Sequence, residues 1–211
     1  MPAQIEAVFG RNITLVYDAL DFNAVDRNKL RGIFPGVTPT IMDMPDMIVA
    51  VYPPNPLLIQ IGDRRIRVNL TLEIPELGDF PMWEYAEKCK DLIQTSKTGI
   101  IAYGYNFDFG VLITDTTIED LLISKFVHDR SGLEKTLQGT LVSFLPRITF
   151  KNGNVKYDIV FEPFKNNRIK AHGNAHLQKE GIQLPEGDQL RLSYVEHFAR
   201  LRSVILSLLT K

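Results

Sequence analysis

The chain has 211 residues, 45% of them hydrophobic and 23% charged, which excludes a disordered polypeptide and is typical of a globular protein. Its 24 Lys+Arg against 25 Asp+Glu give a formal net charge of −1, which argues against a protein that holds nucleic acid through a strong basic excess. The single cysteine, Cys89, excludes an intramolecular disulfide and is typical of a reducing compartment.

We expect neither a membrane span nor a secretory signal. Each apolar stretch ends in a charged residue or a proline well short of the roughly 20 residues that cross a bilayer. The N-terminal residues 1–6 lack the basic region followed by an apolar run that marks a secretory signal. The sequence therefore predicts a cytoplasmic protein without a membrane partner.

The first half of the chain is predicted to contain a long strand, a helix, three short strands and a second helix. These elements are expected at residues 4–18, 23–34, 47–52, 57–61, 65–74 and 83–93. Gly10 marks a bulge in the long strand, and Gly62-Asp63 predicts a type II′ hairpin turn. Asp43 and Asp46, on either side of Pro45, are expected in an irregular surface loop.

The second half is predicted to repeat this order. A long strand is expected at residues 98–114, followed by a helix from residue 117 and a short helix after a break near residue 129. Three strands at residues 140–151, 154–162 and 168–178 and a last helix at residues 189–209 complete this half. Thr116–Glu119 and Ser131–Glu134 have the spacing of capping boxes, and Asn152-Gly153 predicts a hairpin turn. The buried stripe of the last helix is expected to be Val195, Phe198, Leu201, Val204, Ile205 and Leu208.

The two halves, 1–97 and 98–211, share the element order β-α-β-β-β-α, which indicates an internal duplication. Residues 66–73 can be laid on 155–162, with a proline soon after each stretch. We predict an α+β fold of long antiparallel strands with helices packed on one face of a shared sheet, and two long strands that pair near a pseudo-twofold axis. The doubled element order, without any residue motif, is similar to that of the saddle-shaped TATA-box-binding protein family, which is also an internal duplication.

Basic and polar residues of two predicted strands are the first candidate binding site. These residues are Arg65, Arg67, Arg168, Lys170, His172 and His176. They form either a solvated sheet face or, if the sheet brings them together, a surface for an anion or polyanion. His172 and His176 do not form a metal pair, because four strand residues separate them by about 13 Å.

The strand over 98–114 carries a second candidate. Tyr103, Tyr105, Phe107 and Phe109 share one parity, and they are expected to be sheet core, a ligand groove or a subunit interface. Asn106 and Asp108 lie on the opposite parity among glycines, which leaves room for a close partner.

The sequence contains no signature of catalysis. It lacks a phosphate-binding Gly-rich loop, a dinucleotide-binding fingerprint, a nucleophile elbow and a Cys-x-x-Cys pair. We therefore expect no cofactor or metal and favour a non-enzymatic binding or assembly protein that acts as a homo-oligomer and has a possible protein partner. The alternatives are a small-molecule-binding protein or enzyme with an aromatic-lined groove, and a nucleic-acid- or anion-binding protein that uses the basic sheet face.

Overall fold

The protein is described by a computed structural model that covers residues 3–70, 80–93 and 99–210. Within these residues, nine antiparallel strands form one sheet in the order β2-β3-β4-β5-β1-β6-β9-β8-β7. The strands are β1 (Ala3–Tyr17), β2 (Thr40–Met44), β3 (Met47–Val51), β4 (Leu57–Gly62), β5 (Arg65–Leu70), β6 (Ile100–Ile113), β7 (Arg147–Asn152), β8 (Val155–Phe164) and β9 (Arg168–Gln178).

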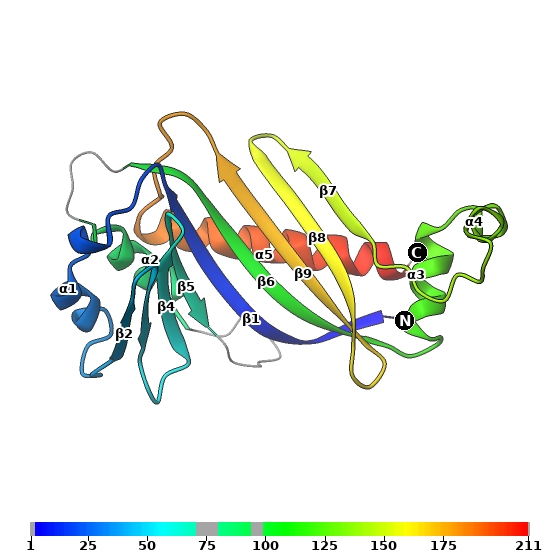
Figure 1. The fold of residues 1–211 in the computed structure, drawn as a ribbon, viewed down its shortest axis with the longest axis horizontal. Helices are drawn as coiled ribbons and strands as arrows, with labels where there is room; N and C mark the ends of the chain where they lie inside the picture. The colour runs from blue at the N-terminus through cyan, green and yellow to red at the C-terminus, as the bar shows by residue number, and fades with distance from the viewer. Residues whose placement is uncertain (1–2, 71–79, 94–98, 211) are drawn as a thin grey trace.

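The α-helices of the described residues lie on one face of the sheet and at its two ends (Figure 1). They are α1 (Arg27–Gly32), α2 (Met82–Lys90), α3 (Ile118–Phe126), α4 (Arg130–Leu137) and α5 (Gly187–Thr210), with a short 3-10 helix η1 (Phe22–Ala24) before α1. Helix α5 runs behind β6, β9 and β8 in Figure 1, and it contacts β1, β6 and β9. Helix α2 contacts β1, β5 and α5. The expected α+β fold with helices on one sheet face is confirmed.

Strands β1 and β6 pair in the middle of the sheet and join the two halves of the chain. Their register runs from Ala3 opposite Ile113 to Tyr17 opposite Ile100, and it shifts between Ile5 and Ala7, between Val8 and Gly10, and between Val16 and Tyr17. The sheet continues through β5, β4 and β3 on one side and through β9, β8 and β7 on the other. One sheet therefore runs through both halves.

The strand likeness that indicated a duplication does not follow this topology. Strand β5 lies next to the central strand β1, whereas β8 is separated from β6 by β9. Laying residues 66–73 on 155–162 therefore compares strands in different places, because both simply alternate apolar and polar residues. Residues 71–74 of that stretch lie outside the described residues.

Alternation of side chains builds the core between sheet and helices. In β5, Ile66, Val68 and Leu70 are buried, while Arg65 and Arg67 are only half-buried. The same alternation holds along β9, where every second residue from Ile169 to Ala175 is buried. Since successive strand residues point to opposite faces, one face of the sheet packs on helices and the other is polar.

Two hairpin turns differ from expectation by one residue. The turn between β4 and β5 is Asp63-Arg64, and both residues have positive φ, 48° and 56°, as in a type I′ turn rather than the expected type II′ turn at Gly62. The turn between β7 and β8 is Gly153-Asn154, because Asn152 still pairs with Val155. In both hairpins the residue expected to begin the turn, Gly62 or Asn152, is instead the last paired residue of the first strand.

The helix boundaries also need correction. The helix expected over 23–34 is η1 followed by α1, which Asp26 caps by accepting hydrogen bonds from the amides of Asn28 and Lys29. Thr117, not Thr116, caps α3, and Asp129, not a residue of the expected box at 131–134, caps α4 by accepting from Gly132 N. A side-chain oxygen that accepts from an amide two or three residues later decides each start.

The secondary structure expected for residues 40–44 and 140–146 is wrong. Residues 40–44 form β2, which pairs with β3, so Asp43 lies in a strand and Asp46 in the turn that follows. The first half therefore has one strand more than the expected β-α-β-β-β-α order. The strand expected over 140–151 begins only at Arg147, and residues 140–146 have no regular structure.

The buried stripe of α5 is rotated from the expected one. Its buried residues are Leu190, Tyr194, His197, Phe198, Leu201, Ile205 and Leu209, whereas Val195 is 37% exposed. Gly173 of β9 lets the helix approach the sheet, because a Cβ atom there would lie 3.1 Å from Leu201 Cδ2. The expected stripe shares Phe198, Leu201 and Ile205 with the observed one but left out Tyr194 and His197, which carry polar groups.

Candidate functional site

The face of the sheet opposite α2 and α5, called the open face below, carries most of the polar residues singled out from the sequence. In an antiparallel sheet, directly opposed residues point to the same side. On that basis Arg67, Thr14, Gly104 and His176 share one row across β5, β1, β6 and β9. Figure 1 is viewed toward this face, with α5 behind the strands.

The next row of the open face consists of four asparagines on four adjacent strands. Asn69 of β5 opposes Asn12 of β1, Asn12 opposes Asn106 of β6, and Asn106 opposes Asn174 of β9. All four are half-buried. We call these residues the amide row, and it continues on β8 with Asp158, which opposes Asn174.

The amides of this row are hydrogen-bonded to each other in one direction. Asn174 Nδ2 donates to Asn106 Oδ1, and Asn106 Nδ2 donates to Asn12 Oδ1 over 2.6 Å. Thr14 Oγ1 also donates to Asn12 Oδ1, over 2.9 Å. Asn69 is separate, since its Nδ2 contacts the carbonyl oxygens of Leu58 and Arg67 at 3.3 Å. Hydrogen bonds of this kind each contribute about 1 kcal/mol, so the row is held in a fixed geometry.

Beside the amide row, Asp108 joins His172, which lies opposite it, and Lys170, which lies opposite Gly110, into one group. Asp108 Oδ1 lies 2.6 Å from His172 Nδ1, and its Oδ2 lies 3.3 Å from Lys170 Nζ. Burial by itself raises the pKa of the Asp108 carboxyl, but the hydrogen bond and charge of His172 and the charge of Lys170 outweigh it and hold this pKa below its ordinary value. The carboxylate therefore neutralises the basic charge of this part of β9.

Three other cations of the open face, all arginines, are also paired with carboxylates. Arg168 Nε donates to Glu6 over 2.9 Å, and Arg147 forms a two-nitrogen contact with Asp158, from Nε at 3.0 Å and Nη2 at 2.5 Å. Arg65 pairs with the exposed Asp63. Among the described residues, Arg67 has no carboxylate partner within ion-pair distance.

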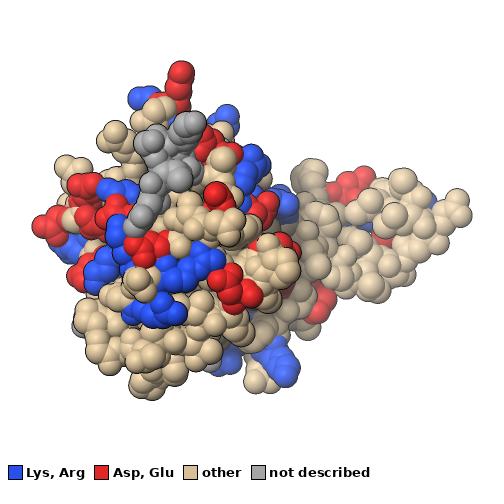
Figure 2. Space-filling model, turned by 60° about the vertical axis from the view of Figure 1, so that its left-hand side comes forward, with Lys and Arg blue, Asp and Glu red and all other residues tan. Residues whose placement is uncertain are grey.

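The sheet thus does not bring the basic candidates into one patch. Arg65 and Arg67 lie on β5, and Arg168, Lys170, His172 and His176 lie on β9, with β1 and β6 between them. Figure 2 shows Lys and Arg interspersed with Asp and Glu over the end of the molecule that comes forward in that view. Asn106 and Asp108 lie between the two basic strands.

Two hollows open on this face along the amide row. A small hollow of about 110 Å³ lies over Gly10, Asn12, Asn106 and Asp108. A larger hollow of about 320 Å³ lies over Thr14 and Gly104, with Arg65 and Arg67 on one side and His176 on the other. The glycines leave both depressions, because they carry no side chain to fill the surface above the strand.

Toward β2 the open face becomes apolar. Met42 and Met44 of β2 are 45% and 37% exposed, and by register they share this face with Met47 and Val49 of β3. Methionine side chains are flexible and polarizable, so such a patch can adapt to an apolar partner.

The aromatic residues of β6 are core. Tyr105, Phe107 and Phe109 are fully buried and Tyr103 is 5% exposed. Tyr105 donates a hydrogen bond to Ser193 Oγ of α5, and the Phe107 and Phe109 rings lie 5.1 and 5.4 Å from that of Phe198. The expected alternative of an aromatic-lined groove is therefore wrong, because α5 fills the space in front of these rings.

Two buried ionisable residues were missed by the sequence analysis. His197 of α5 is 6% exposed, and its Nδ1 lies 2.9 Å from the hydroxyl of Tyr157. Arg11 of β1 is 3% exposed on the same side of the sheet as its neighbour Phe107, and burial lowers its pKa. No local sequence pattern marks either residue, since each is a polar residue at a position where the strand or helix periodicity predicts an apolar one.

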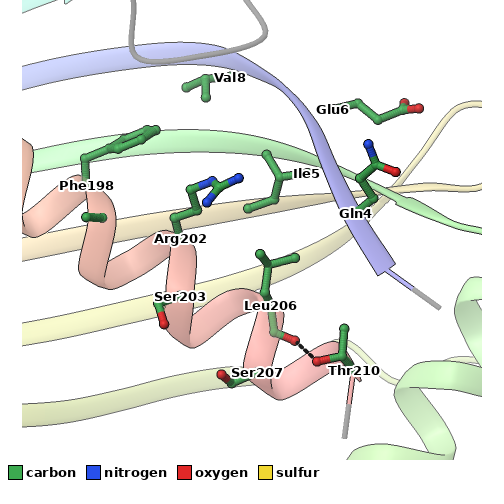
Figure 3. A pocket seen from close by; sticks show the side chains of 11 residues that line it. Gln4, Ile5, Glu6, Val8, Phe198, Arg202, Ser203, Leu206, Ser207 and Thr210 are labelled. Carbon is green, nitrogen blue, oxygen red and sulfur yellow. Dashed lines mark hydrogen bonds between the residues drawn. The ribbon is translucent and has the colours of Figure 1, made fainter. Parts of the chain in front are cut away.

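A further hollow lies on the helix side, away from the open face (Figure 3). It measures about 970 Å³ and lies between the N-terminal end of β1 and the C-terminal half of α5. Ile5, Val8 and Leu206 provide apolar walls, while Arg202 and Ser203 provide polar atoms. None of the candidate binding residues proposed from the sequence lines it.

Comparisons with known proteins give no further assignment. No protein-family model matches the chain, and no curated protein matches it. Within the described residues there is no group of three or more His, Cys, Asp or Glu side chains placed to hold a metal ion. The helices of residues 3–70, 80–93 and 99–210 include none that is long and apolar enough to span a bilayer.

Proposed function

We propose that this is a binding protein and that the open face is its binding surface. The observation that carries the proposal is the amide row, four asparagines in register on adjacent strands, on a sheet face that no helix of the described residues covers. A solvated face needs only polar residues of some kind. Here the polar groups are short, half-buried and bonded to each other, which supports recognition of a partner by fixed donors and acceptors.

The surroundings of the amide row support the same proposal. Hollows on both sides of Asn106 give a partner access to the amides. The apolar Met42 and Met44 lie on the same face and can contact a protein partner. Most specific interfaces combine apolar contacts with hydrogen bonds in this way.

The test is a stability screen in which metabolites, peptides and oligonucleotides are added to the wild type and to Asn106→Lys. A compound that binds the open face raises the melting temperature of the wild type but not of the variant, because the lysine blocks the amide row. Leu192→Lys, on the exposed side of α5, is the matched control and keeps the response. If every stabilising compound acts equally on wild type and Asn106→Lys, the open face is not the binding surface.

We further propose that the protein works as a homo-oligomer that associates through an arm at residues 127–146. Helix α4 has no buried residue, and Leu137, Val142 and Leu145 are 57%, 76% and 54% exposed. Figure 1 shows α4 projecting from the end of the sheet beside α3. Three large apolar side chains on one projection favour contact with another subunit over contact with water.

Light scattering coupled to size-exclusion chromatography tests this proposal at micromolar concentration. The wild type is expected as an oligomer, and the triple change Leu137→Ser, Val142→Ser, Leu145→Ser is expected to shift it toward the monomer. The double change Leu192→Ser, Val195→Ser removes exposed apolar side chains from α5 and serves as control. A wild type that is strictly monomeric contradicts the proposal.

We also propose that the two halves arose by duplication. The support is topological: β1 and β6 pair at the centre, each flanked by the last strand of its own half, β5 or β9. The extra strand β2 belongs to the first half only. Superposition of an experimental structure tests the proposal, since placing β1 on β6 and β5 on β9 should bring α2 onto α5. A misplaced α2 contradicts it.

A cytoplasmic location is part of the proposal. Its support is the lone Cys89, which is fully buried in the core. Burial raises the pKa of this thiol, which keeps it protonated and unreactive. Fractionation of the source cells tests this location, and recovery of the protein outside the cytoplasmic fraction contradicts it.

A further inference from the structure

We infer that the hollow over Gly104 binds the phosphate group of a small molecule. This inference rests on the proposed function, because it assigns a ligand class to part of the open face. The hollow lies where the row Arg67, Thr14, Gly104, His176 runs beside the amide row. Neighbouring strands are about 4.8 Å apart, so Arg67 and His176 stand roughly 14 Å apart with their side chains on the same face.

The first argument is the excess of hydrogen-bond donors. Asn12, Asn106 and Asn174 have two N–H bonds each, six in all. Two of the six are used within the row, by Asn174 and Asn106, so four remain without a partner among the described residues. The carbonyl oxygen of Asn12 is already occupied by two donors. A ligand rich in hydrogen-bond acceptors matches this surface, and phosphate is such a ligand.

The second argument is charge. Lys170 and His172 share Asp108, Arg168 has Glu6, and Arg147 has Asp158. Among the described residues Arg67 has no carboxylate within ion-pair distance, and the Arg65 pair with Asp63 is exposed and therefore weak. Arg67 therefore places a positive charge at the edge of this hollow, and the same row of the open face continues through His176 to Lys156 of β8. Guanidinium groups bind phosphate through two parallel hydrogen bonds.

The third argument is size, which favours a small molecule over a polyanion. The hollow of about 320 Å³ is larger than a phosphate ion and within the range of small-molecule sites. A nucleic-acid backbone needs a continuous basic stripe. Here the carboxylates of Asp108 and Asp158 lie among the basic residues of the β6–β9–β8 side, so the stripe is not purely basic. A phosphate monoester, with its organic part above Thr14 and Val16, fits both observations.

The experiment is an NMR titration of ¹⁵N-labelled full-length protein with inorganic phosphate, at constant ionic strength maintained with chloride. We expect saturable shifts of the Asn12 and Asn106 side-chain amides with a Kd on the order of millimolar, as is usual for a free anion. Arg67→Gln is expected to weaken binding about tenfold or more. The matched control Arg191→Gln removes an arginine from α5, on the opposite layer, and leaves the Kd unchanged.

A second variant tests the inference even if Arg67→Gln does not fold. Asn106→Asp has nearly the same shape but replaces an N–H donor by a negative charge, and it is expected to abolish the phosphate-induced shifts while the remaining spectrum stays folded. Absence of saturation in the wild type, or equal weakening by Arg67→Gln and Arg191→Gln, overturns the inference. Either outcome leaves the proposed function intact if the stability screen still finds a compound that stabilises the wild type but not Asn106→Lys.

Oligonucleotide addition separates the two sources of phosphate. A single-stranded oligonucleotide is expected to bind no more tightly, per phosphate, than inorganic phosphate. Much tighter binding that falls steeply with salt identifies a polyelectrolyte surface and overturns the small-molecule assignment.

Discussion

His197 is the buried ionisable residue that links α5 to the sheet. Its ring stacks on Tyr105 at 5.3 Å between centroids, and its Nδ1 lies 2.9 Å from the Tyr157 hydroxyl. Burial lowers the pKa of His197 below its ordinary value of 6.5, while Glu196 raises it and Arg200 lowers it further. The folded state therefore favours the neutral imidazole, in which Nδ1 can accept the tyrosine proton.

We predict that His197 makes folding stability depend on pH just below neutrality. Below pH 6.5 the unfolded chain takes up a proton at His197 while the folded chain resists it, so the free energy of unfolding falls as the pH drops. The slope is at most about 1.4 kcal/mol per pH unit. Urea unfolding from about pH 7.5 to about pH 5 measures it, and His197→Gln should remove this part of the slope.

The control for this experiment is His128→Gln, since His128 is exposed. Its unfolding free energy should follow that of the wild type at each pH. Parallel curves for the wild type and His197→Gln would mean that the buried histidine carries no proton linkage.

At the scale of elements, the hairpin of β4 and β5 shows how pairing decides a turn. Ile61 pairs with Ile66 and Gly62 with Arg65, which leaves only Asp63 and Arg64 for the turn. Arg64 has a φ of 56°, in the left-handed region that disfavours residues with a side chain. Its carbonyl oxygen accepts a hydrogen bond from Tyr17 N over 2.9 Å, so the turn also holds the end of β1.

We predict that Arg64→Gly stabilises the protein by about 0.5–1 kcal/mol, because glycine adopts the left-handed conformation without a steric cost. The midpoint of urea unfolding measures the gain. Lys165→Gly in the turn between β8 and β9 is the control, because Lys165 does not have a positive φ. It should destabilise slightly, and a lower midpoint for Arg64→Gly would show that the arginine side chain contributes more than its backbone costs.

At the scale of the whole molecule, one core extends over both halves. Buried residues from Ala3 to Leu209 form a continuous hydrophobic cluster. Trp83 of α2 lies 6.1 Å from Tyr194 of α5 between ring centroids, so the covering helices of the two halves touch. The pairing of β1 with β6 joins the same two halves through backbone hydrogen bonds.

We predict that the chain unfolds as a single cooperative unit. Trp83 is the only tryptophan, so its fluorescence reports the contact between the halves, while far-ultraviolet circular dichroism reports all secondary structure. The two signals should give the same urea midpoint within error. Separate midpoints would show that the halves unfold independently and that the central strand pair is weaker than the core implies.

Much of the fold was predictable because it depends on local patterns. Alternation located most of the strands, including β6 and β9, and glycine or asparagine located the turns to within one residue. Strand β2 was missed because Pro45 between two aspartates is typical of a loop. The strand expected over 140–151 was started too early, an error of the opposite kind, since Val142 and Leu145 are apolar but exposed on the arm.

By itself, the sequence determined the α+β class, the long strands and the polar parity of β5, β6 and β9. Only the tertiary structure decided strand order and register, because these depend on contacts between residues far apart in the chain. No local pattern distinguishes Asn12, Asn69 or Asn174 from other polar residues of alternating strands. The register aligned all three with Asn106 into the amide row. The packing of α5 likewise decided that the aromatic residues of β6 are core, since a sheet face is buried only where another element covers it.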